Sequence, residues 1–193
     1  MIVTRTAQPK YTNVKINDYK KDLNFADSCS EQINQFIKQK LIKFFIIKDI
    51  ITVKEAHLQF AGVDKIVKTI DGKIIKIEEK IRRVTRNDIL IELLADQDQY
   101  LKNINKIGWG LKNYSTDILL YYFTDSNTGW FFHWSKFQKT LLKNLPNWYD
   151  LAKANKNGFM LKTAYNRNYK SLNIVIPKNV FLNAYIKEGG VII

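Results

Sequence analysis

The residues of this sequence best suited to chemistry are Asp64, Glu78 and Lys80, which lie in two runs of alternating apolar and polar residues. The dipeptide Asp71-Gly72 separates the runs and favours the tight turn of a β-hairpin. Two carboxylates on neighbouring strands suit a hard cation such as Mg²⁺, and a nearby ammonium group suits a phosphate. That chemistry requires the hairpin to bring the three side chains to one face.

The length of the turn decides which side chains meet. A two-residue loop at Asp71-Gly72 pairs Ile70 with Lys73 and places Asp64 opposite Glu79. A three-residue loop, 70–72, with Gly72 in the left-handed region pairs Thr69 with Lys73 and places Asp64 opposite Glu78. We predict the second register, because it collects apolar residues on one face and polar residues on the other. The apolar face holds Val63, Val67, Ile75, Ile77 and Ile81, and the other holds Asp64, Glu78, Lys80 and Arg82.

In this register two carboxylates face each other, which costs stability unless a cation lies between them. Lys80 lies two residues beyond Glu78 on the same face and would point at whatever the cation binds, for which a phosphate is the natural candidate. The alternative is a solvated hairpin face of mixed charge that includes Glu79.

The pattern of Asp64, thirteen intervening residues and Glu78-Glu79-Lys80 resembles the D-x(n)-(D/E)-x-K signature of the PD-(D/E)XK nuclease superfamily. A helix before the hairpin, with the Asp at the start of the hairpin and E-x-K on its second strand, is similar to that superfamily as well. Val63 stands where the family name has proline, a residue that many members lack. Further segments resemble small phage or mobile-element members across residues 25–185: Val63-Asp64-Lys65-Ile66, Glu78-Glu79-Lys80 with Arg82, Asn87-Asp88-Ile89-Leu90-Ile91-Glu92, Gly108-Trp109, Asp117-Ile118-Leu119-Leu120-Tyr121 and Asn168-Tyr169.

The resemblance implies a metal-dependent deoxyribonuclease that hydrolyses DNA phosphodiester bonds as an endonuclease, with Mg²⁺ as the cofactor and Mn²⁺ as a substitute. Asp64 and Glu78 would bind the metal, and the backbone carbonyl of Glu79 would complete the protein ligands. Lys80 would orient the attacking water or stabilise negative charge on the phosphate. An acid of the first helix often reaches the site in this superfamily, which makes Glu31 a further catalytic candidate.

Several candidate residues keep two interpretations. Glu31 also completes a capping box, Ser28-x-x-Glu31, at the predicted start of a helix. Glu92 lies in an apolar strand and either joins the site or faces solvent. Three arginines that follow the motif are candidates for binding DNA phosphates, with a solvated strand end as the alternative. They are Arg82, Arg83 and Arg86.

The charge of the chain is strongly basic. It has 31 Lys+Arg against 18 Asp+Glu, a net charge of +13. Such a field favours polyanions, with DNA as the first candidate and an anionic membrane surface as the second. A generally lysine-rich composition is the plain alternative. The single cysteine, Cys29, excludes an internal disulfide and fits a reducing, cytoplasmic compartment. Residues 1–10 lack the apolar run of a signal peptide, and we expect neither a membrane span nor membrane binding.

We predict one α/β domain over residues 1–193: a mixed central β-sheet flanked by helices, with a restriction-endonuclease-like core. Residues 1–26 are predicted as an N-terminal arm, and the core is placed at about 27–185. Helices are expected from Ser28 and from a second capping box, Ser135-x-x-Gln138, to near Pro146. Two other functions stay open: a nuclease-like fold that binds nucleic acid without cutting, and a phage-borne interaction protein. A homodimer would suit paired cuts.

Overall fold

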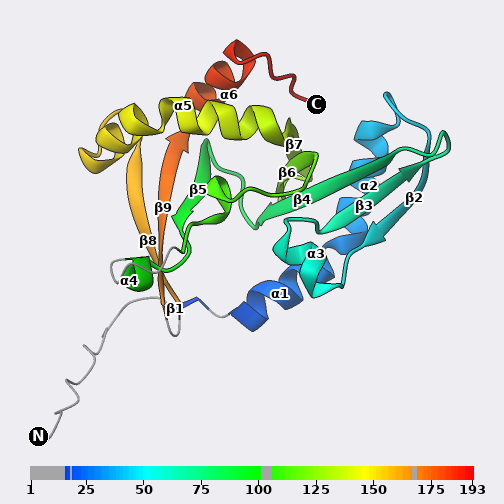
Figure 1. Ribbon diagram of the computed structural model, residues 1–193, viewed down its shortest axis with the longest axis horizontal. Helices are drawn as coiled ribbons and strands as arrows, with labels where there is room; N and C mark the ends of the chain where they lie inside the picture. The colour runs from blue at the N-terminus through cyan, green and yellow to red at the C-terminus, as the bar shows by residue number, and fades with distance from the viewer. Residues whose placement is uncertain (1–15, 18, 101–105, 167–168) are drawn as a thin grey trace, which may run out of the picture.

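The computed structural model describes residues 16–17, 19–100, 106–166 and 169–193, whose strands form two sheets (Figure 1). The strands are β1 (Ile16–Asn17), β2 (Ile47–Thr52), β3 (Lys65–Thr69), β4 (Ile74–Arg82), β5 (Asp88–Leu94), β6 (Ile118–Phe123), β7 (Thr128–His133), β8 (Met160–Asn166) and β9 (Lys170–Pro177). The helices are α1 (Tyr19–Ser28), α2 (Ser30–Leu41), α3 (Ala56–Phe60), α4 (Gln97–Tyr100), the 3-10 turn η1 (Trp109–Leu111), α5 (Trp134–Lys153) and α6 (Lys178–Lys187).

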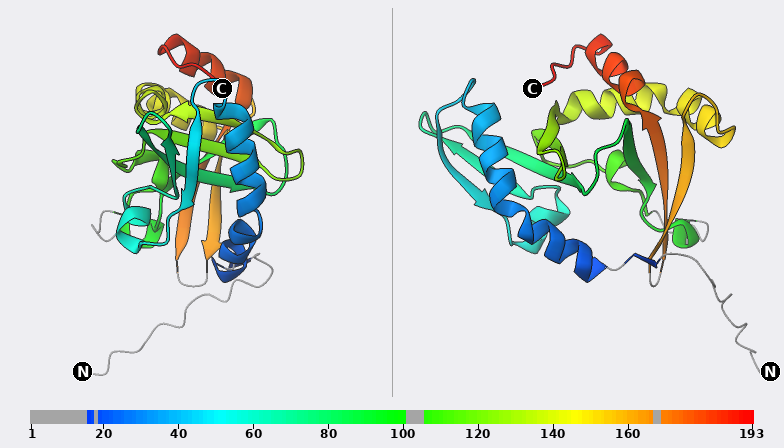
Figure 2. Two further views of the ribbon diagram at one scale, coloured as in Figure 1. Left: turned by 90° about the vertical axis from the view of Figure 1, so that its right-hand side faces the viewer. Right: turned by 180° about the vertical axis from the view of Figure 1, so that it is seen from behind.

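The larger sheet has five strands in the order β2-β3-β4-β6-β7. Strands β2, β3 and β4 form an antiparallel meander, β6 runs parallel to β4, and β7 pairs antiparallel with β6. Between β4 and β6 the chain passes through β5 of the other sheet and through η1. Seen from behind, α1 and α2 run along one face of this sheet (Figure 2). The predicted mixed sheet flanked by helices is therefore confirmed.

The smaller sheet has the order β1-β8-β9-β5, with β8, β9 and β5 antiparallel and β1 parallel to β8. Helix α5 contacts β8 and β9, and α6 contacts β5 and β9. From the sequence, the apolar run at 89–94 and the alternation of Leu172, Ile174 and Ile176 predict two strands. They fall within β5 and β9, where apolar side chains are buried in pairs such as Ile89 with Ile176. The sequence predicted these strands without indicating that they form a second sheet.

Two apolar clusters lie on opposite faces of the larger sheet. One packs α2, through Ile33, Phe36 and Ile37, against residues that include Leu120 and Tyr122 of β6. The other fills the space between the two sheets, α5 and α6, and includes Leu119, Tyr121 and Phe123 of β6. Alternate side chains of β6 thus point to opposite cores, as strand geometry requires. Because Glu78 pairs with Leu119 and Lys80 with Tyr121, Glu78 and Lys80 face the second sheet and not α2.

The hairpin of β3 and β4 adopts the predicted register. Lys65 pairs with Ile77 and Val67 with Ile75, while Thr69 donates its N–H to the carbonyl of Lys73 across 3.0 Å. Gly72 has φ +84°, the left-handed conformation that the three-residue loop needs. The strand pairing ends where Lys65 meets Ile77. Asp64, one residue earlier, bonds through its N–H to the carbonyl of Ile77 and through its carboxylate to the N–H of Glu79, close enough to Glu78 to influence its pKa.

The predicted start of the first long helix is wrong. Ser28 is the last residue of α1, its hydroxyl donates to the carbonyl of Phe25, and Cys29 precedes α2 without a side-chain cap. A capping box needs extended backbone before the helix, whereas here one helix leads almost directly into the next. Within the predicted arm, residues 19–26 belong to α1; residues 1–15 and 18 lie outside the described part.

The second capping box and the predicted helix end are also wrong. Helix α5 begins at Trp134, and the Gln138 side chain donates to the carbonyl of Lys112 instead of closing a box. The helix continues through Pro146 to Lys153, since Trp148 and Ala152 bury themselves in the core beyond the proline. Within the residues described, no helix is long and apolar enough to cross a membrane.

Candidate functional site

Asp64 is held at the start of β3 by backbone bonds to both neighbouring strands. Its N–H donates to the carbonyl of Ile77 in β4 across 2.9 Å, and its carbonyl accepts the N–H of Val53 after β2 across 2.8 Å. Gly62, with φ +76°, turns the chain into this position after α3. The backbone of Asp64 is therefore fixed, and its carboxylate lies beside β4.

Glu78 and Lys80 project from the same face of β4 and form an ion pair with each other. The Glu78 side chain is 4% exposed and the Lys80 side chain 25%. Burial raises the pKa of Glu78 to about 7; Lys80 opposes this, whereas the nearby Asp64 adds to it. Burial lowers the pKa of Lys80, but the carboxylates of Glu78 and Asp64 outweigh it, so the pKa is raised. The structure thus brings together the three residues predicted to do the chemistry.

The main chain of Glu79 belongs to this site, although its side chain does not. Its N–H donates to Asp64 Oδ2 across 2.8 Å. In a hydrogen-bonded antiparallel pair, each residue both donates its N–H to its partner and accepts the partner's N–H at its C=O. The N–H and the C=O of one strand residue thus point toward the same neighbouring strand. The carbonyl of Glu79 therefore points to the edge where Asp64 lies. Val63, the residue before Asp64, does not bond to β4 through its N–H, which donates to the carbonyl of Leu58 in α3.

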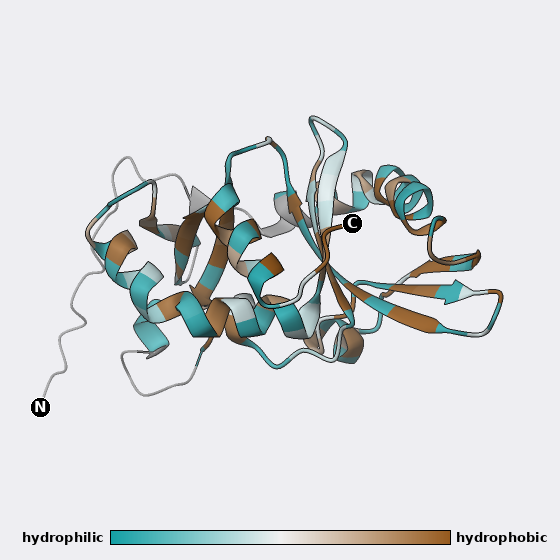
Figure 3. Ribbon diagram, turned by 90° about the horizontal axis from the view of Figure 1, so that it is seen from above, coloured by the Kyte–Doolittle hydropathy of each residue, from teal (hydrophilic) through white to brown (hydrophobic). Residues whose placement is uncertain are grey.

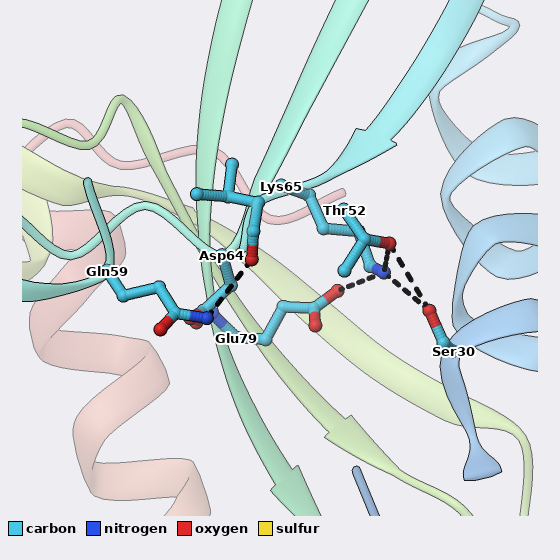
Figure 4. A network of polar contacts seen from close by, with 7 residues as sticks. Ser30, Thr52, Gln59, Asp64, Lys65 and Glu79 are labelled. Atoms are coloured by element: carbon cyan, nitrogen blue, oxygen red, sulfur yellow. Dashed lines mark hydrogen bonds and ion pairs between the residues drawn. The ribbon is translucent and has the colours of Figure 1, made fainter. Parts of the chain in front are cut away.

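The side chain of Glu79 points to the other face of the sheet and meets a buried lysine (Figure 4). Lys65 is 1% exposed, and its Nζ lies 3.9 Å from Glu79 Oε1. The same Nζ donates to Ser30 Oγ at the start of α2 and to Thr52 Oγ1 at the end of β2, each across 2.9 Å. Lys65 thus joins α2, β2, β3 and β4 directly behind the Asp64–Glu78 pair. Sequence analysis missed this role, because an alternating strand gives no sign that an inward lysine has partners.

Burial raises the pKa of Glu79 to about 8 despite the opposing charge of Lys65, and the pKa of Glu78 to about 7, from 4.5 for both. The folded protein keeps these protons at pH values where the unfolded chain has lost them. The free energy of unfolding should therefore fall as pH rises above 4.5, by up to about 1.4 kcal/mol per pH unit for each retained proton. We expect Glu79→Gln to abolish the fall between about pH 7 and about pH 8, where Glu78 is already ionised, in urea denaturation series. An unchanged slope would contradict the raised pKa of Glu79.

Three further residues surround Lys80 on the side of the second sheet. The Lys80 Nζ lies 5.2 Å from the centre of the Trp109 ring. Glu92 accepts the N–H of Trp109 across 3.4 Å; burial raises its pKa, and this N–H and the Lys80 charge oppose the rise. Burial raises the pKa of Tyr114 to about 12, with Lys80, Glu78 and Asp64 all close enough to influence it. Of these, the sequence had offered Glu92 as a site member, and it gave no signal for Tyr114.

The ring of Tyr114 packs directly on Gly62, so that a Cβ added at Gly62 would overlap the ring. We expect Gly62→Ala to lower the free energy of unfolding by about 2–4 kcal/mol, combining backbone strain with this overlap. Gly72→Ala is the matched control, because φ there is +84° and nothing lies within 4 Å of an added Cβ. Its cost should be only about 1–2 kcal/mol. Equal losses in chemical denaturation would show that the Tyr114 contact is unimportant.

The structure does not bring Glu31 to the Asp64–Glu78 pair. Glu31 is exposed on α2, which covers the opposite face of the sheet, and its carboxylate accepts a bond from Gln35 across 3.4 Å. The physical reason is the register of α2: Ser30, one residue earlier, faces inward to Lys65, and the next helical position points outward.

The three arginines after the motif have separate environments. Arg82 points inward, where it donates to the Tyr121 hydroxyl across 2.7 Å and lies 3.9 Å from Asp88, so it is not placed to bind DNA phosphates as predicted. Arg83 stacks on the ring of Phe25, 4.4 Å from its centre. Arg86 is exposed. Alternation along the strand end explains the difference between Arg82 and Arg83.

The oxygen atoms of Asp64, Glu78 and Glu79 are the candidate ligands for a divalent metal. Among the described residues no three His, Cys, Asp or Glu side chains form a group that could hold a metal ion. The Asp64–Glu78 pair, with the Glu79 carbonyl on the same edge, is a smaller set of oxygen donors. It fits Mg²⁺, which commonly keeps several waters and uses one or two carboxylates. No protein-family model, curated protein or solved structure matches this chain.

Proposed function

We propose that this protein is a Mg²⁺-dependent deoxyribonuclease of the PD-(D/E)XK type, most simply an endonuclease. One observation supports the proposal above all: the Asp64 carboxylate, held by the N–H of Glu79, lies close enough to Glu78 and Lys80 to influence the pKa of both, and Glu78 and Lys80 form an ion pair. A buried carboxylate beside a second, half-buried one reduces stability, and a protein keeps such an arrangement where it serves binding or catalysis. The net charge of +13 agrees with a polyanionic substrate.

The surrounding fold supports the same proposal. The helix α2 precedes the hairpin, Asp64 stands at its start, and Glu78-Glu79-Lys80 lies on its second strand, in the order that the resemblance implies. The sheet is mixed, with β6 parallel to β4. A restriction-endonuclease-like core is therefore part of the proposal, with the second sheet as an addition of which only β5 lies between β4 and β6 in the chain.

In this mechanism Asp64, Glu78 and the Glu79 carbonyl would hold the metal, which when bound supplies Lewis-acid stabilisation of a phosphate and acidifies water. Lys80 directs its ammonium to the phosphate as negative charge develops there. With Glu78 as a metal ligand, the Trp109 ring and the Glu92 carboxylate would be the neighbours that restrain the Lys80 ammonium. Tyr114 keeps its proton at neutral pH because its pKa is about 12, so it presents a hydrogen-bond donor to an anion.

Cleavage of plasmid and of single-stranded DNA in Mg²⁺, Mn²⁺ or EDTA tests the function. We expect cleavage with either metal and none in EDTA. Lys80→Met should reduce the rate about a hundredfold or more, since it removes one charge that stabilises the transition state. The variant should still bind Mn²⁺ in calorimetry, and Lys153→Met, an exposed lysine of α5, is the matched control. Salt-sensitive DNA binding without cleavage would instead indicate a nuclease-like fold that binds and does not cut.

A further inference from the structure

Exposed apolar side chains gather where the β3–β4 hairpin ends. Ile70, in the turn, is 66% exposed, and Ile74, the first residue of β4, is 59% exposed. The connection from α2 to β2 lies beside them, joined by the Ile70 N–H to the carbonyl of Ile46 across 2.9 Å, and adds Ile42, Phe44 and Ile46, all more than half exposed. We call residues 42–46 and 70–74 the hairpin tip. Figure 3 shows apolar segments in brown along this projecting end.

The hairpin tip is also basic. Residues 38–48 contain four lysines and no acid. On the hairpin itself Lys68 is exposed, and the one acid of the turn, Asp71, is neutralised by Lys73 at 3.1 Å. Exposed apolar side chains with lysines before, within and after them in the sequence, on a protein of net charge +13, complement a ligand that has both phosphates and apolar faces.

The tip is continuous with the candidate site. Ile74, Lys76, Glu78 and Lys80 alternate along one face of β4, and Ile74 pairs with Lys68 on that face. Helix α2 covers the opposite face, so this face stays open toward the turn. Glu78 lies six positions after Gly72, a distance of roughly 20 Å in an extended strand, or about six base pairs of DNA. A strand cut at Asp64–Glu78 can therefore reach the tip.

We propose that the hairpin tip contacts unpaired bases, so that the substrate is DNA with a single-stranded segment about six nucleotides from the cut. This inference rests on the proposed nuclease function. Lysines bind phosphates of any DNA, but Ile70, Ile74 and Phe44 gain only where base faces are exposed. Inserting apolar side chains into an intact duplex costs a few kcal/mol of unstacking per base step. Where a duplex meets a single-stranded segment the bases are already unpaired, so this cost is smaller.

Binding in EDTA tests the inference apart from cleavage. Fluorescence anisotropy would compare a blunt duplex oligonucleotide with the same duplex carrying a single-stranded extension. We expect about tenfold tighter binding of the extended duplex, from roughly one stacked base. The double variant Ile70→Ser/Ile74→Ser should lose this preference and keep its affinity for the blunt duplex. Leu142→Ser, which changes an equally exposed side chain of α5, should retain the preference.

Lysine variants separate phosphate contacts from base contacts. Lys68→Ala should weaken both oligonucleotides alike and reduce the salt dependence of binding by about one ion, whereas Lys153→Ala should change neither. Equal binding of both oligonucleotides by the wild type, or a preference that survives the isoleucine double variant, would overturn the inference. So would binding of the tip to phosphatidylserine vesicles with no binding to DNA. Loss of cleavage with an intact preference would count against the nuclease function alone.

Discussion

Asp64→Asn and Glu78→Gln are each expected to reduce metal-dependent DNA cleavage by at least about a thousandfold, because each removes a charged ligand from a two-carboxylate site. Both substitutions keep the size of the side chain. The backbone bonds that fix Asp64 to Ile77 and Val53 do not involve the carboxylate, so the local fold should persist. Initial cleavage rates, with Mn²⁺ affinity from calorimetry, would measure the two losses together.

The same variants should not destabilise the metal-free protein. Burial raises the pKa of Glu78 to about 7, so its ionised form lowers the free energy of unfolding above that pH. Glu78→Gln should thus gain stability relative to wild type as pH rises from about 4.5 to about 7, and keep that gain at higher pH. Asp49→Asn, at an exposed position of β2, is the control for both properties. Normal cleavage by either site variant would refute the proposed chemistry.

The arrangement of the site followed from local sequence because the hairpin is governed by local rules. Gly72 accepts the left-handed conformation, and the alternation of Val67, Ile75 and Ile77 fixes which side of each strand is buried. A slip of one residue would have buried Asp64 and exposed that set. Contacts between residues near in sequence and one turn were enough to bring the Asp64 carboxylate beside the strand that carries Glu78.

The parts that sequence reasoning missed depend on contacts between distant segments. Ser28 and Glu31 match a capping box, but α1 immediately before them occupies the backbone that a cap requires. Pro146 removes one helical hydrogen bond, yet α5 continues because Trp148 is buried by Phe159 and Phe181. Neither competing interaction is visible within a window of a few residues.

Lys65 shows the same limit on the functional side. An alternating strand predicts that position 65 shares a face with Val67, and a lysine there looks unfavourable for a core. Its partners Ser30 and Thr52 come from two other elements, 35 and 13 residues away. Only the assembled fold shows that the ammonium is satisfied, and that it supports the strand on which Glu78, Glu79 and Lys80 lie.

We therefore expect Lys65→Ala to lower the free energy of unfolding by about 3–5 kcal/mol. The substitution empties the space of a side chain that is 1% exposed and removes two hydrogen bonds of a charged donor. Lys65→Met keeps most of the buried volume and should cost only about 1–3 kcal/mol, the share of the lost hydrogen bonds. Urea denaturation of the two variants beside wild type separates packing from charge.

The pH dependence of the Lys65→Met loss identifies the ion pair with Glu79. The ammonium opposes the rise in the Glu79 pKa, so without it the pKa should lie above about 8. Above that pH the folded variant retains a proton that both wild-type states have released, and its stability continues to fall by up to about 1.4 kcal/mol per pH unit. The gap between variant and wild type should thus widen from about pH 8 upward, and adding Glu79→Met should close it. A difference in the free energy of unfolding that stays constant with pH would mean that Lys65 acts through Ser30 and Thr52 alone. The charge of Lys65 would then not affect the pKa of Glu79.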